Sequence, residues 1–232
     1  MAIAKVQEVF SYSASGGSAD KTVTIATPGA GNTLVLLTNS TNGATVSSVS
    51  GGGVTWEYVV TSTNAAGDKV ELWIGPNSSG SGTTITVTVS NTYARFDLSV
   101  TEWSGMPTTS VEDGGSEADT TSPDITTPSI TPTAGQAVLL LAFANVYTTT
   151  VSAGPTGGFT AIPTTGGSGF GDFAYQIVES ASGSYQAGWT TAAGYGTRRA
   201  GLFAFDGEEA GGAAVGRGLT HSTKLSRLSL VG

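Results

Sequence analysis

The sequence predicts an all-β protein: a two-layer antiparallel β-sandwich, jelly-roll-like, built from two similar halves and followed by an extended C-terminal arm. Only 11% of its 232 residues are charged and 34 are glycine, a composition typical of strands and tight turns. No stretch before the C-terminal region has the 3.6-residue apolar spacing of a helix. The hydrophobic residues, 38% of the chain, occur in short runs bounded by turn residues, which indicates packed strands instead of disorder.

An internal repeat gives the clearest view of the architecture. The segment GNTLVLL at 31–37 is echoed 104 positions later by GQAVLLL at 135–141. Constant block order with slightly drifting offsets is typical of a duplicated unit whose loops differ in length. We therefore expect halves at about 1–105 and 120–207. The other matched blocks, at offsets of 105, 103 and 102, are 54–56 with 159–161, 72–74 with 175–177, and 99–105 with 201–207.

Apolar alternation between turn residues predicts the individual strands. Residues 22–27 alternate and stop at a Pro-Gly turn, whereas 34–38 is continuously apolar, as in a central strand buried on both faces. In 69–75, 83–90 and 95–104, every second residue is apolar, which places those side chains on one face. The remaining expected strands are 54–61 in the first half and 125–130, 137–144, 158–163, 173–178, 185–190 and 199–205 in the second.

Residues 106–119 are expected to connect the halves, because they are acidic and contain few apolar side chains. With about six strands in each half, the chain could form one sandwich of roughly twelve strands or two small sandwiches. We favour the single sandwich over 1–207, since each half is short for a robust core of its own.

From residue 208 the sequence changes character, with a glycine- and alanine-rich linker at 208–216 and a basic, Leu-containing peptide at 217–232. Residues 1–207 carry six basic and fifteen acidic side chains, a net charge of −9, whereas 210–232 carry three basic and no acidic ones. Fully extended, 210–232 would reach about 75 Å at ~3.3 Å per residue. Binding of this arm to a partner and a disordered chain end are the two alternatives. The side chains expected to bind are Arg217, Leu219, His221, Lys224, Leu225, Arg227, Leu228 and Leu230.

Composition also limits the environment and the partners. An acidic body disfavours nucleic acid and anionic membranes. The chain has no cysteine, no run near the ~18 apolar residues of a membrane span and no apolar stretch of a secretory signal at its start. The chain is therefore expected to be made in the cytosol, yet its Thr-, Ser- and Gly-rich, Lys-poor surface resembles that of extracellular proteins. This combination is typical of proteins of virus particles, which leave the cell by lysis.

No residue set predicts catalysis, so we expect a non-enzymatic protein without a cofactor. His221 is the only histidine and lies in the arm, and without cysteine the usual zinc ligands are lacking. Glu102 is the best candidate carboxylate for hydrolysis, but no second acid lies two to four residues away on the same strand face. Glu57 and Glu71 are expected on solvated faces. The repeat aligns Glu102 with Ala204, so this polar position does not recur.

Two further ligand sites are conceivable. Trp73 and Trp103 are expected to point outward from the apolar faces of their strands, where an indole could contact another subunit or stack on a surface glycan. Calcium could bind carboxylates in and beside the connector, although their spacing differs from that of an EF-hand loop. These acids are Glu112, Asp113, Glu117, Asp119 and Asp124.

The segments 53–60, 68–75, 84–89 and 99–105 together resemble β-sandwich proteins encoded among the structural genes of tailed bacteriophages. The ending from 218 to 232 is also similar to C-termini found on such phage proteins. The resemblance implies a virion protein, either a capsid decoration or a tail-associated protein, which binds major capsid or tail proteins and assembles as a homo-oligomer. It assigns no role to any single residue. A carbohydrate-binding or host-receptor-binding module is the alternative.

Overall fold

The computed structural model describes residues 2–13, 18–92, 94–106, 111–119, 122–146, 151–164, 171–192 and 198–207. Within them the chain is all β, and all strands pair antiparallel in packed sheets, which confirms the predicted sandwich class. None of these residues belongs to a helix of the length and apolarity that crosses a membrane.

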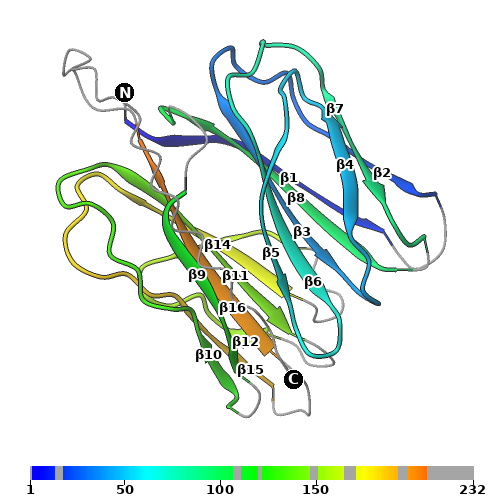
Figure 1. The fold of residues 1–232 in the computed structure, drawn as a ribbon. Coiled ribbons are helices and arrows are strands. Elements are labelled where there is room, and N and C mark those ends of the chain that lie inside the picture. The colour runs from blue at the N-terminus through cyan, green and yellow to red at the C-terminus, as the bar shows by residue number, and fades with distance from the viewer. Residues whose placement is uncertain are drawn as a thin grey trace.

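The first half forms a five-stranded sheet packed on a three-stranded one (Figure 1). The larger sheet has the order β1-β8-β3-β6-β5 and the smaller one β2-β7-β4. The strand bounds are β1 (Ala4–Ser13), β2 (Asp20–Thr24), β3 (Thr33–Ser40), β4 (Val46–Gly51), β5 (Glu57–Thr63), β6 (Lys69–Gly75), β7 (Thr84–Val89) and β8 (Phe96–Ser104).

The second half has the same topology, with eight added to every strand number. Its larger sheet has the order β9-β16-β11-β14-β13 and its smaller sheet β10-β15-β12. The structural repeat therefore includes strand order as well as sheet number. The bounds are β9 (Val111–Asp119), β10 (Asp124–Thr126), β11 (Val138–Val146), β12 (Val151–Ala153), β13 (Thr160–Ile162), β14 (Gly171–Val178), β15 (Gly188–Thr191) and β16 (Arg198–Asp206).

Each half contains most of the strand pairing of a jelly roll. An eight-stranded jelly roll wraps a long hairpin, so that strands 1 and 8, 2 and 7, 3 and 6, and 4 and 5 pair. The first three pairs are present as β1·β8, β2·β7 and β3·β6. The fourth is absent, because β5 pairs with β6 in the larger sheet. Strands β4 and β5 therefore lie at the edges of two different sheets and do not pair with each other.

The two five-stranded sheets pack face to face and share an apolar core, with the small sheets on the outside (Figure 1). Val35 and Leu72 from the first half meet Leu141 and Phe173 from the second in this central core. The chain thus forms two small sandwiches joined through their larger sheets, instead of the favoured single sandwich of twelve strands. The cores of the halves are supplemented by the shared one, which is why β3 is buried on both faces.

The expected connector is partly a strand. Residues 111–119 form β9, an edge strand that pairs only with β16. An edge strand needs little apolar alternation, and a Cβ at Gly114 would lie 2.4 Å from Phe203 Cδ1. Glycine at position 114 is therefore required by close packing. From composition alone, the same glycine-rich and acidic segment resembled a linker.

Strand register also changes the alignment of the halves. Leu34 pairs with Glu102 and Val138 pairs with Asp206. Because Leu34 and Val138 are 104 positions apart, Glu102 corresponds to Asp206 and not to Ala204. The two alignments differ by two residues, and a slip of two keeps every side chain on the same face. An acidic position therefore does recur in both halves.

Candidate functional site

The predicted partner-binding side chains of the C-terminal arm all lie outside the described residues. They are Arg217, Leu219, His221, Lys224, Leu225, Arg227, Leu228 and Leu230.

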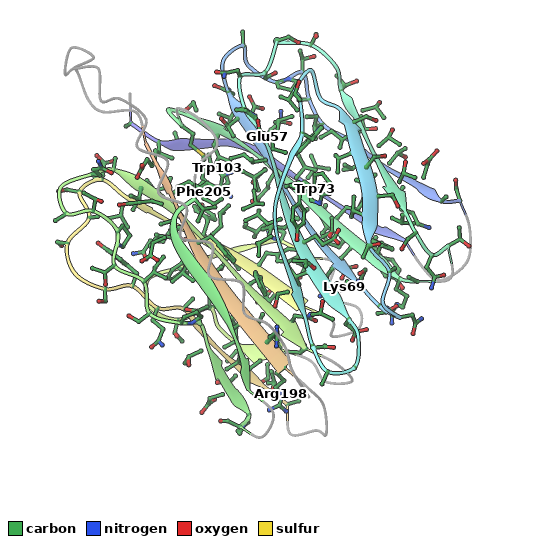
Figure 2. The ribbon with its side chains drawn as sticks, in the orientation of Figure 1. Glu57, Lys69, Trp73, Trp103, Arg198 and Phe205 are labelled. Atoms are coloured by element: carbon green, nitrogen blue, oxygen red, sulfur yellow. The ribbon has the colours of Figure 1, made fainter. Side chains whose placement is uncertain are left out.

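Trp103 lies between the two halves and is 0% exposed. Figure 2 shows it beside Phe205, in the region where the two larger sheets face each other. Its Nε1 donates to Thr101 Oγ1 at 2.8 Å, and its ring meets Tyr175 edge to face with centroids 5.1 Å apart. The prediction that Trp103 contacts a glycan or another subunit is therefore wrong, because its surface is already used to join the halves.

Trp73 is partly exposed and packs against the core of the first sandwich. Its ring meets that of Tyr58 edge to face at 5.4 Å, and Tyr58, its partner across β5 and β6, is 51% exposed. Trp56 packs against the same core and donates its Nε1 to Gly51 O at 3.0 Å. We call Trp56, Tyr58 and Trp73 the aromatic edge. Sequence reasoning identified only Trp73, because the pairing of Tyr58 with Trp73 depends on strand register.

Glu102 is fully buried and all its contacts serve the fold. Its Oε1 accepts from Gly29 N at 2.7 Å and Asn32 Nδ2 at 2.5 Å, and its Oε2 accepts from Gln7 Nε2. Gln7 also pairs with the backbone of Ala26 in both directions, at 3.1 and 2.9 Å. The carboxylate therefore ties the loop before β3 to strands β1 and β8. A group enclosed by three donors is poorly suited to act as a catalytic base.

The corresponding place in the second half holds two carboxyl groups. Glu112 on β9 accepts from Thr133 N through Oε1, so it ties the loop before β11 to the sheet. Its Oε2 and Asp206 Oδ1 are buried without a donor. Burial, followed by the hydrogen bond and charge of Glu112, raises the pKa of Asp206 to about 6.

Glu71 is buried, contrary to the expectation of a solvated position, whereas Glu57 is exposed as expected. Glu71 Oε2 accepts from Val46 N at 2.8 Å, which links β6 of the larger sheet to β4 of the smaller one. Burial raises the pKa of the Glu71 carboxyl. The sequence could not show this, because a strand has the same alternation of apolar and polar residues whether its carboxylate bridges two sheets or faces water.

The acids proposed for calcium are not gathered into one site among the described residues, which contain no group of three or more metal-ligating side chains. Asp113 on β9 accepts from Thr131 N at 2.9 Å, and Asp124 on β10 accepts from Thr190 Oγ1 at 2.8 Å. The side chains of Glu117 and Asp119 lie outside what the structure describes.

Comparison of the chain with protein-family models, with curated proteins and with solved structures finds no match.

Proposed function

We propose that the protein is a non-enzymatic structural component of a virion, either a capsid decoration or a tail-associated protein. The observation that carries the proposal is the central core shared by the two larger sheets. It joins two sandwiches into one body, which suits a protein that spans neighbouring subunits and stabilises them mechanically.

The buried polar groups support the same function. Glu102 and Glu71 are engaged with backbone and side-chain donors that hold loops and sheets in place. Asn145 Nδ2 donates to Asp68 O at 3.1 Å, and this contact links the two halves. These groups increase the cohesion of the body, which is the property that a decoration protein needs.

Attachment occurs in part through residues 208–232. The body carries a net charge of −9 and the segment 210–232 carries three basic side chains and several leucines. An apolar, basic peptide suits strand addition or groove docking on an acidic neighbour, a major capsid or tail protein or another copy. A stable attachment needs about 1,200 Å² of buried surface, so part of the interface comes from the sandwich body.

The test compares the full chain with a chain ending at Gly207 for incorporation into particles purified from a lysate. Circular dichroism checks that the truncated chain folds. We expect the truncated chain to be folded but lost from the particles. A set of Leu225→Ser, Leu228→Ser and Leu230→Ser should weaken incorporation more than Ser222→Ala and Ser226→Ala, the matched control. Full incorporation of the truncated chain would contradict the role of the arm.

The aromatic edge favours one second function, binding of a surface glycan. Tyr58 is half exposed and Trp73 lies against it, so a sugar ring could stack on Tyr58. Quenching of tryptophan fluorescence by a glycan panel tests this, since Trp56 and Trp73 lie at the edge. Tyr58→Ala should abolish quenching, whereas Tyr12→Ala, which removes an exposed tyrosine from β1, should not. Equal quenching in both variants would reject glycan binding at this edge.

A further inference from the structure

The two halves have a polar junction at the same place in the fold but build it from different side chains. In each half a polar junction ties the first strand, the last strand and the loop before the third strand together. In the first half Gln7 on β1 donates its amide to Glu102 on β8. In the second half the acid of the last strand, Asp206 on β16, is influenced by a carboxyl group of the first strand, Glu112 on β9, whereas Glu102 accepts from an amide.

Two carboxylates cannot hydrogen-bond to each other, because both are acceptors only. Glu112 Oε1 is occupied by Thr133 N, and Glu112 Oε2 and Asp206 Oδ1 are both buried with no donor. Yet the two side chains are close enough for Glu112 to contribute, after burial, to the raised pKa of Asp206. The contact is favourable only when one of the carboxyls carries a proton that the other accepts.

Among the described residues of β9, β11, β16 and the loop 131–137, the only basic ones are Arg198 and Arg199, at the opposite end of β16 from Asp206. Strand β11 and the loop 131–137 contain no charged residue. Besides Glu112, β9 carries Asp113, which accepts from Thr131 N, and Glu117 and Asp119, whose positions pair with Ala200 and Arg198 toward the other end of β16. Strand β14 pairs with the other edge of β11, where Val178 lies opposite Val138, and Glu179 directly follows this strand. Lys5, in the first half, is bound to Glu8 at 2.6 Å. Among the described residues, Glu112 is the charged group that shifts the pKa of Asp206.

We propose that Glu112 and Asp206 share one proton and form an acid-dependent latch, which holds edge strand β9 and the 131–137 loop on β16. The latch closes in acid and loosens as the pH rises through about 6. It lies at the end of β16, the last strand that the structure describes.

The pKa of Asp206 gives the sign and the pH window. The folded-state pKa is raised from 3.8 to about 6, so the folded state binds this proton more tightly than the unfolded chain. The stabilisation is complete below the unfolded value of 3.8 and is lost as the pH rises through about 6. At higher pH both carboxyls are charged and repel each other.

Hydrogen exchange of the full chain between pH 5 and 7.5, corrected for the intrinsic exchange rate, tests the latch. We expect protection of the β9 amides to fall about tenfold over this range, since one unit of pKa shift corresponds to a factor of ten and partial exposure of Asp206 reduces the full effect. Protection of β1, the counterpart of β9, should change far less. Constant protection of β9 would overturn the proposal.

Two matched substitutions identify the groups. Glu112→Gln supplies an amide donor, as Gln7 does in the first half, and β9 should then be protected equally at both pH values. In a separate variant, Gln7→Glu should make the protection of β1 depend on pH as that of β9 does in the wild-type protein. If Glu112→Gln does not fold, Asp206→Asn provides the same test, because its amide can donate to Glu112. Wild-type pH dependence in a folded Glu112→Gln or Asp206→Asn variant would reject the latch.

Discussion

Trp103 from the first half and Tyr175 from the second meet edge to face across the boundary between the two sandwiches, with ring centroids 5.1 Å apart. Lys5 Nζ lies over the Tyr175 ring, 4.6 Å from its centroid. The boundary is therefore built as a protein interior, with a fully buried indole and an aromatic partner, and not as a hinge between separate domains.

Replacement of Trp103 by alanine should strongly destabilise the protein. The indole is 0% exposed, and removal of such a side chain leaves a cavity that costs about 3–5 kcal/mol. Urea denaturation measures the loss. Trp56→Ala, at the partly exposed aromatic edge, is the control and should cost clearly less. Similar losses for both variants would mean that the boundary core contributes little.

Truncation of Glu102 tests whether its role is structural. Glu102→Ala leaves the donors Gly29 N, Asn32 Nδ2 and Gln7 Nε2 without their acceptor, and each buried donor left unpaired costs about 1–3 kcal/mol. We expect a lower unfolding midpoint and faster proteolysis of the loop 26–32. Glu57→Ala, at an exposed position of β5, should leave both unchanged. An unchanged midpoint in Glu102→Ala would show that the loop is held by other contacts.

The sequence was sufficient for the class of fold and for most strands, because alternation and turns are local properties. It could not give the number of layers. The double burial of Leu34 to Leu37 fits a strand in the middle of one sandwich and equally a strand whose second face packs on another half. The acidic β9 and the pair Glu112–Asp206 were missed because they depend on which strand lies at an edge and on strand register, both of which are long-range properties.

The pH dependence of global stability should favour acid. Burial raises the pKa of Asp97 and of Asp172 to about 6. Each raised pKa stabilises the folded state below the unfolded value of 3.8 and loses this contribution as the pH rises through about 6. The free energy of unfolding should therefore be larger at pH 5 than at pH 7.5, by roughly 1–2 kcal/mol after allowance for partial solvation.

Chemical denaturation at the two pH values measures this difference, and Asp172→Asn isolates one contribution. Asp172 Oδ2 accepts from Trp189 Nε1 at 3.0 Å, and an asparagine side chain keeps an acceptor there without a titrating charge. The variant should lose part of the pH dependence while remaining folded. Greater stability of the wild-type protein at pH 7.5 than at pH 5 would contradict the assignment of these carboxyls.

Adjacent glycines on β9 distinguish a packed edge strand from a connector. A Cβ at Gly114 would lie 2.4 Å from Phe203 Cδ1, whereas the nearest atom to a Cβ at Gly115 is Pro128 Cγ at 3.3 Å. Phe203 stacks on Phe143 in the shared core, so it has little freedom to move away. Gly114→Ala should therefore cost about 1–3 kcal/mol through overpacking. Gly115→Ala should cost less, because the ring of Pro128 needs to shift only slightly. In a solvated connector both alanines would be tolerated equally, and thermal unfolding of the two variants side by side decides between the two cases.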